Sequence, residues 1–198
     1  MAQTWTAGRL CLDFANSSKL STYRDLAAWA GWAGAVSPPL ARALARAGGR
    51  RPAAASDALA RAETLRSAIV AVMASVAERR PPPARALDDL NGALAQTLGR
   101  TRIVRRGPGF GWEWKSGDDA LDRLLWPVVR SASEVLTSTD VAAVRVCAAP
   151  GCGRLFLDAS RNGSRRWCDM AVCGNRAKVQ RHYARRRWRR ARSAGGKS

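Results

Sequence analysis

The chain has 198 residues, of which 34 are lysine or arginine and 15 are aspartate or glutamate, so its formal net charge is +19. A length of this order suits one or two domains, and a hydrophobic content of 46% argues against wholesale disorder. No apolar run approaches about 18 residues, which excludes a membrane-spanning helix. A chain this basic is expected to bind a polyanion.

The charge is concentrated near the C-terminus. Residues 147–198 hold 14 basic and two acidic residues, whereas residues 1–146 hold 20 basic and 13 acidic residues. We therefore predict an α+β, mostly helical protein in three parts. Residues 1–144 form a helical domain with a β-hairpin. Residues 145–190, which hold four of the five cysteines, form a zinc finger, and residues 191–198 form a disordered basic tail.

The first part shows the periodicity of helices. Apolar residues recur at intervals of three and four, which is typical of a helix with one buried face. The segments with this pattern are residues 22–33, 37–49, 53–80 and 84–98. Ser37 is a candidate cap for the second of them, and Gly48-Gly49 is its expected stop. Residues 10–16 are expected to form either a helical turn or a buried strand.

A change of pattern follows near residue 101. Residues 101–105 and 110–114 flank Gly107-Pro108-Gly109, and strand-like segments around such a turn predict a β-hairpin. A last helix is predicted over residues 118–136, with a kink at Pro127.

Four of the five cysteines fall in two close pairs, Cys147 with Cys152 and Cys168 with Cys173. Each pair can supply two thiolates to one edge of a tetrahedral Zn²⁺ site, and the segment between the pairs can fold them together. We therefore predict that these four cysteines bind zinc. Cys11 lies between two leucines and is expected to be a buried thiol.

The zinc is expected to be structural. Four thiolates close the coordination shell, whereas catalytic zinc usually keeps one position open for water. Residues 147–198 contain no glutamate, so the proton shuttle that zinc deaminases use has no candidate there. In so small a module the metal supplies stability that a hydrophobic core cannot.

The elements predicted around the ligands are those of a treble clef, with a knuckle, a hairpin and a helix. Residues 154–158 are predicted as a strand, residues 165–168 as its returning strand, and Asn162-Gly163 as part of the turn between them. A helix is predicted over residues 171–190, with Cys173 in its first turn.

Most of the charge of this module lies on the predicted helix, where no acid is available to pair with it. A solvated, self-repelling helix is one interpretation. Binding to a phosphate backbone is favoured, because it removes the repulsion and releases counterions. The candidate nucleic-acid contacts are Arg161, Arg165, Arg166, Arg176, Lys178, Arg181, Arg185, Arg186, Arg187, Arg189 and Arg190.

Several motifs combine in one order along the chain. They are the knuckle at residues 145–153, Phe156, the segment at residues 160–168, and Cys173-Gly174-Asn175-Arg176. This combination resembles the CGNR zinc-finger family, which takes its name from the last motif. The N-terminal part, with Leu12-Asp13-Phe14-Ala15-Asn16-Ser17 followed by Asp25, Leu26, Trp29 and long helices, is similar to the ABATE domain that usually precedes this finger.

The resemblance implies a bacterial, DNA-binding regulator of transcription with zinc on its four cysteines. It also implies that the N-terminal domain senses a ligand or binds a partner. For Asn175 we expect a hydrogen bond that braces the hairpin or the knuckle. For Arg176 we expect a contact with phosphate or with the N-terminal domain.

Three polar residues near the N-terminus, Asp13, Asn16 and Arg24, are candidate ligand contacts. Ordinary capping and surface pairing is the alternative interpretation of all three. DNA is the expected partner of the finger, and RNA or the ribosome is the alternative. Residues 1–30 lack the pattern of a signal peptide, so we expect a cytoplasmic protein with reduced cysteines.

An enzyme is not expected. His182 is the only histidine, and the sequence contains no Gly-x-Ser-x-Gly, His-Glu-x-x-His or phosphate-binding glycine motif. The acid pairs Asp88-Asp89 and Asp118-Asp119 consist of adjacent residues, which do not face each other on a helix. A sensor that releases zinc on thiol oxidation is a further alternative, and it requires exposed, reactive thiolates.

Overall fold

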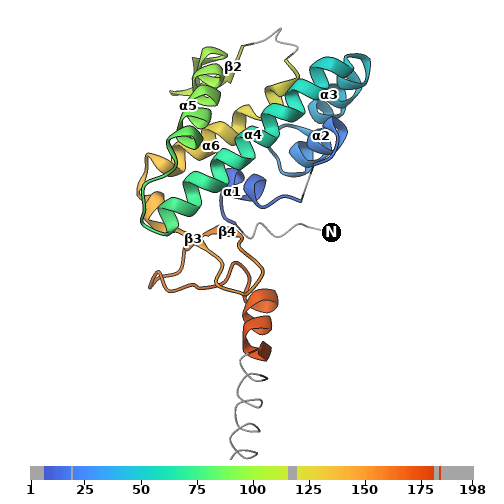
Figure 1. Ribbon diagram of the computed structural model, residues 1–198. Coiled ribbons are helices and arrows are strands. Elements are labelled where there is room, and N and C mark those ends of the chain that lie inside the picture. Colours follow the sequence, from blue (N-terminus) through green and yellow to red (C-terminus); the bar gives the residue numbers. More distant parts are fainter. Residues whose placement is uncertain (1–6, 19, 116–119, 181–182, 184–198) are drawn as a thin grey trace, which may run out of the picture.

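A computed structural model describes residues 7–18, 20–115, 120–180 and 183. Residues 7–143 contain helices packed around one long helix, and we call this part the helical bundle (Figure 1). The described residues from 144 onward form a small module at one end of the bundle, which we call the finger. The helices are α1 (Leu10–Ala15), α2 (Tyr23–Trp32), α3 (Pro38–Arg50), α4 (Pro52–Ala77), α5 (Ala84–Gly99) and α6 (Trp126–Leu136).

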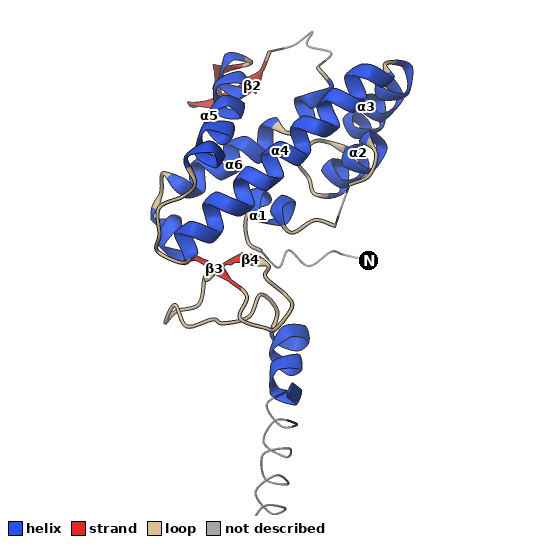
Figure 2. Ribbon diagram, in the orientation of Figure 1, coloured by secondary structure: helices blue, strands red, loops and turns tan. Residues whose placement is uncertain are grey.

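Two small antiparallel hairpins lie at opposite ends of the bundle (Figure 2). β1 (Thr101–Arg106) pairs with β2 (Gly109–Trp114) around the predicted turn. β3 (Val144–Val146) pairs with β4 (Leu155–Leu157) where the bundle meets the finger. The mostly helical α+β class that the sequence predicts is therefore confirmed.

The long helix α4 supplies the centre of the core, because its predicted apolar face is buried along most of its length. Its buried residues include Ala58, Ala62, Leu65, Ile69 and Met73. The other helices pack around this face with large side chains of their own. Phe14 of α1 and Leu26 of α2 are fully buried, and the ring of Trp29 lies 5.0 Å from that of Phe14.

The boundary between α3 and α4 differs from the predicted stop at Gly48-Gly49. Helix α3 continues to Arg50, and Ser37 occupies its N-cap position without a side-chain hydrogen bond. The boundary is set by Pro52 in the first turn of α4, because the helical region is disfavoured for a residue that precedes proline. Arg51 accordingly has φ −132° and ψ 68°.

The predicted kink at Pro127 is wrong. The predicted helix over residues 118–136 includes a 3-10 turn, η1 (Leu121–Leu124), followed by α6, which begins at Trp126. Pro127 therefore lies in the first turn of α6. Proline is well tolerated there because a first-turn amide has no carbonyl partner within the helix.

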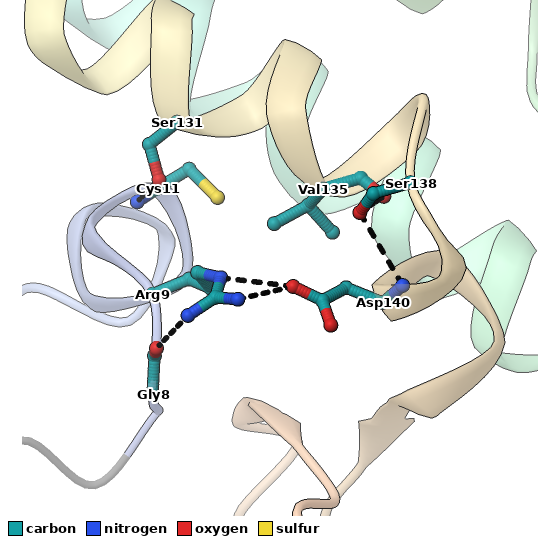
Figure 3. A network of polar contacts seen from close by, with 7 residues as sticks. All are labelled: Gly8, Arg9, Cys11, Ser131, Val135, Ser138 and Asp140. Atoms are coloured by element: carbon teal, nitrogen blue, oxygen red, sulfur yellow. Dashed lines mark hydrogen bonds and ion pairs between the residues drawn. The ribbon is translucent and has the colours of Figure 1, made fainter.

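Helix α1, the helical alternative for residues 10–16, is fixed by polar contacts to α6 and to the turn that follows α6 (Figure 3). The Arg9 guanidinium donates two hydrogen bonds to Oδ2 of Asp140, one of them from Nε at 3.1 Å. The amide of Cys11 donates to Oγ of Ser131 at 3.1 Å. Cys11 is buried as predicted, and burial raises the pKa of its thiol to about 11.

Strand β4 connects the two parts of the protein, because its side chains alternate between two cores. Leu155 and Leu157 pack into the core of the bundle, whereas Phe156 packs against the finger cysteines. Successive side chains of a strand point to opposite faces, so a strand of three residues can serve both cores. The predicted domain boundary after residue 144 falls within β3, the partner of this strand.

The second edge of β4 is bonded to the N-terminal segment. The side-chain amide of Asn16 donates to the carbonyl of Leu155 at 2.7 Å and accepts from the amide of Leu155 at 2.9 Å. The amide of Leu157 donates to the carbonyl of Ala7 at 2.9 Å. Asn16 therefore takes the place of a neighbouring strand. Within the described part of the chain, no helix combines the length and apolarity needed to cross a membrane.

Replacing Asn16 by alanine should destabilise the junction between bundle and finger. The change leaves the amide and the carbonyl of Leu155 without their present partners, which costs about 1–3 kcal/mol for partly buried groups. Chemical denaturation of both proteins measures the loss. Asn91→Ala on the exposed face of α5 is the control and should stay within about 0.5 kcal/mol. Equal stabilities of Asn16→Ala and the control would contradict the role given to Asn16.

Candidate metal centre and nucleic-acid interface

The four predicted ligands converge in the finger. The Sγ atoms of Cys147, Cys152, Cys168 and Cys173 all lie within 4.8 Å of one another. The sulfur of Cys173 is 3.6 Å from that of Cys152 and 3.7 Å from that of Cys168. A zinc ion with four thiolates at about 2.3 Å places its sulfurs about 3.8 Å apart. The spacing therefore fits one tetrahedral ion, and all four cysteines are free of disulfides.

Local backbone structure positions the first pair. The amide of Cys147 donates to the carbonyl of Arg154 at 2.8 Å, which closes the knuckle between the two strands. Gly151 and Gly153 have φ values of 71° and 63°, in the left-handed region that favours glycine. The amide of Cys168 donates to the sulfur of Cys147 at 3.4 Å and thereby links the two pairs.

A π-helical turn, η3 (Met170–Gly174), holds the last ligand, and an α-helix continues through residues 175–180. Asp169 caps the turn by accepting the amide of Val172 at 2.7 Å. The Asn175 side chain donates to the carbonyl of Ala171 at 2.8 Å. The expectation that Asn175 braces the hairpin or the knuckle is therefore wrong, because its amide is used within its own helical turn.

Burial shapes the chemistry of the thiols. Cys147, Cys168 and Cys173 are buried, and Cys152 is partly exposed. Burial raises the pKa of the Cys168 and Cys173 thiols. Burial also acts to raise the pKa of Cys147, but hydrogen bonds to its sulfur from backbone amides and from the thiols of Cys152 and Cys168 lower it overall. A dication placed among the four sulfurs would stabilise all the thiolates, which is the chemistry expected of a closed structural zinc site.

The buried carboxylate of Asp158 organises the turn after β4, and sequence reasoning assigned it no role. Its oxygens accept the amide of Ser160 at 3.0 Å, the hydroxyl of Ser160 at 2.5 Å and the amide of Arg165 at 2.9 Å. Burial acts to raise the pKa of Asp158, but these hydrogen bonds lower it overall. Aspartate side chains commonly accept the backbone amide two residues on, in an Asx turn, and this tendency could have identified it.

The predicted pairing of residues 154–158 with residues 165–168 is wrong. The strand β4 pairs with β3, which precedes the knuckle, and residues 165–168 form no strand. The reason is that both edges of β4 are occupied, one by β3 and the other by Asn16 and Ala7. The amide of Arg165 is bound by the Asp158 carboxylate instead. The carbonyl of Arg166 instead accepts the amide of Ala148 at 2.9 Å, so the returning segment lies against the knuckle.

The described basic candidates divide into two kinds. Arg161, Arg166, Arg176 and Lys178 are exposed on the turn and on the helix. Arg165 points inward, because its guanidinium donates to the carbonyls of Trp167 and Cys168 and lies 5.0 Å from the ring centroid of Phe156. The remaining candidates lie outside the described residues, and they are Arg181, Arg185, Arg186, Arg187, Arg189 and Arg190.

The three candidate ligand contacts of the bundle do not form one site. Asn16 binds the backbone of Leu155. Asp13 lies nearby at the junction, and its Oδ2 is buried without a hydrogen-bond partner among the described residues. Burial raises the pKa of Asp13 to about 6, against the opposing effects of the Ala7 backbone and Arg154. Arg24 lies elsewhere, on the lining of a cavity between α2, α3 and α4.

Two protein-family models match the chain in sequence. The ABATE model, described as "Putative stress-induced transcription regulator", matches residues 8–139. The model of the CGNR zinc finger matches residues 143–186. No curated protein sequence matches significantly. The two matched segments meet at η2 (Thr139–Ala143) and β3, where the bundle joins the finger.

Replacing Cys173 by serine should abolish stoichiometric zinc binding, because one of four thiolates is lost from a closed site. Elemental analysis of the purified protein should show about one zinc per chain for the parent and far less for the variant. Cys11→Ala is the matched control, since Cys11 lies in the bundle core and should leave the zinc content unchanged. Full zinc in Cys173→Ser would remove Cys173 from the ligand set.

Replacing Asp13 by asparagine should stabilise the protein at neutral pH. A carboxyl group whose pKa rises from 3.8 unfolded to about 6 folded makes the folded state less stable as pH increases through this range. The free energy of unfolding of Asp13→Asn should therefore exceed that of the parent at about pH 7.5, and the excess should shrink at about pH 5. A difference that is constant with pH would show that Asp13 does not titrate as described.

Proposed function

Because the chain belongs to the ABATE family and carries a CGNR zinc finger, we propose that it is a bacterial transcription regulator that binds DNA through the finger. In this proposal Cys147, Cys152, Cys168 and Cys173 hold a structural zinc ion. The metal performs no reaction and fixes the knuckle against the helix that follows Cys173. The bundle serves as the domain that senses a ligand or binds a partner.

The observation that carries the proposal is the set of exposed cations on the metal-linked elements. Arg161 lies on the turn after β4, and Arg166 lies on the segment that returns from this turn to the knuckle. Arg176 and Lys178 lie on the helix. Among the described residues, none of these four side chains forms an ion pair with an acid. Cations without acidic partners bind phosphates favourably, because each contact releases condensed counterions from the nucleic acid.

The direction of the helix supports the same partner. Figure 1 shows the helix that begins near Cys173 extending away from the bundle. An α-helix fits the major groove of B-DNA, where base edges carry a distinct pattern of donors and acceptors. Arg176 and Lys178 can therefore contact phosphates beside a groove while the bundle stays clear of the duplex.

A zinc-releasing redox sensor receives less support. Such a sensor needs accessible thiolates. Cys147, Cys168 and Cys173 are at most 5% exposed, and only Cys152 is partly accessible. We also propose no catalytic role, because a site closed by four thiolates leaves no position for substrate or water.

Removing cations from the finger should reduce the salt dependence of DNA binding. The logarithm of the binding constant falls with the logarithm of salt concentration by about 0.9 for each phosphate contact. Arg166→Ala/Arg176→Ala should therefore lower the magnitude of the slope by about 1.8 in a fluorescence-anisotropy titration of duplex DNA. Zinc content should remain at the parent level.

Arg50→Ala/Arg85→Ala is the control, since it removes two exposed arginines from the bundle. The control should keep the slope of the parent protein. A flat salt response of the parent, or equal slopes for the two double variants, would contradict DNA binding by the finger. Crosslinking in cells followed by DNase or RNase tests the nucleic acid itself, and recovery of RNA alone would replace DNA with RNA as the partner.

A further inference from the structure

A large cavity lies between α2, α3 and the beginning of α4, at a distance from the finger. Its volume is about 1010 Å³, at the upper end of the size range of small-molecule sites. Much of its lining is apolar, with small side chains such as Ala27 and Ala45 and a larger one from Leu59. Small residues on facing helices leave this space unfilled, and the space can accept an apolar body.

The walls of the cavity are held in place by close packing. The ring of Tyr23 lies against Gly48, where an added Cβ atom would be 2.4 Å from Cδ1 of the ring. The hydroxyl of Tyr23 donates to the carbonyl of Leu121 at 2.8 Å, which fixes the ring from its far end. A second close approach joins Gly31 of α2 to Ala41 of α3. The cavity is therefore part of the packed fold, and a ligand does not need to open it.

The charged groups of the lining all have one sign. Arg24 of α2 and Arg42 and Arg46 of α3 line the cavity, and no carboxylate does so among the described residues. None of these arginines forms an ion pair within the described part of the chain. Asp25, the acid next to Arg24, accepts the amide of Thr22 at 2.9 Å in the cap of α2. Arg42 and Arg46 are one helical turn apart and can therefore act together on one anion.

We propose that this cavity binds an anionic amphiphile, a small molecule with an apolar body and one carboxylate, phosphate or sulfonate group. The apolar body lies among the small side chains of α2, α3 and α4, and the guanidinium groups of Arg42 and Arg46 hold the anion, with Arg24 beside them. The role of this ligand as the signal that controls the regulator rests on the function proposed above. The binding site itself does not depend on DNA binding.

The experiment compares two fluorescent probes of nearly the same shape in the absence of DNA. 8-Anilinonaphthalene-1-sulfonate carries an anion, and N-phenyl-1-naphthylamine has the same aromatic body without it. The full chain should bind both probes saturably and the sulfonate more tightly. Arg42→Gln/Arg46→Gln should weaken sulfonate binding about tenfold or more and leave the neutral probe unchanged, because only the anion loses its partners.

Two controls locate the effect. Arg50→Gln/Arg85→Gln removes the same charge from exposed positions outside the cavity lining and should change neither affinity. Ala45→Leu fills the cavity and should weaken both probes, while circular dichroism confirms that the helices are retained.

Equal binding of the two probes, an unaffected Arg42→Gln/Arg46→Gln variant, or an equal loss in the Arg50→Gln/Arg85→Gln control would overturn the proposal. Unchanged binding in Ala45→Leu would place the probes elsewhere and overturn it as well. The salt dependence of DNA binding is measured separately on the same parent protein. A result that contradicts ligand binding in the cavity is therefore distinguishable from a result that contradicts DNA binding by the finger.

Discussion

The position of four sulfur atoms around one point is the constraint on which the C-terminal part of this protein depends. Apart from the cysteines, the buried residues in the finger core are Ala149 and Phe156 among the residues described. A core of this size cannot hold a knuckle, a turn and a helix together, whereas a structural zinc ion contributes about 10–16 kcal/mol of binding free energy to folding. A zinc ion bound by the four cysteines would therefore fix the direction of the helix that carries Arg176 and Lys178.

Strand β4 connects the finger to the bundle, because its side chains belong to the cores of both. Phe156 belongs to the core of the finger, and its neighbours Leu155 and Leu157 belong to the core of the bundle. The free edge of the strand is bonded to Asn16 and to Ala7, so the finger is attached through hydrogen bonds as well as apolar contacts. The two segments that the family models match thus meet in one packed junction, and the basic helix follows the finger at this end of the bundle.

The features that could be predicted from the sequence are those that depend on residues close together in the chain. The clustering of four cysteines follows from their two close pairs in the sequence, and the buried face of α4 follows from the spacing of its apolar residues. Pairing of β4 with β3 could not be deduced in this way, because the strong Asn162-Gly163 turn signal favours a different partner. The inward orientation of Arg165 could not be predicted from the sequence either, since it depends on carbonyl groups that come close to its guanidinium only in the folded chain. Asn16 shows the same limit, because its partner Leu155 is distant in the sequence.

The most direct test of the central claim is amide hydrogen exchange measured with zinc bound and after its removal by a chelator. We expect the amides of Cys147, Cys168 and residues 175–180 to lose protection on chelation. The amides of Leu155 and Leu157 should stay protected, because Asn16 and Ala7 bind them independently of the metal. Unchanged protection of Cys168 and the helix, or loss of protection in β4 equal to that in the helix, would contradict a finger held by zinc and anchored by the bundle.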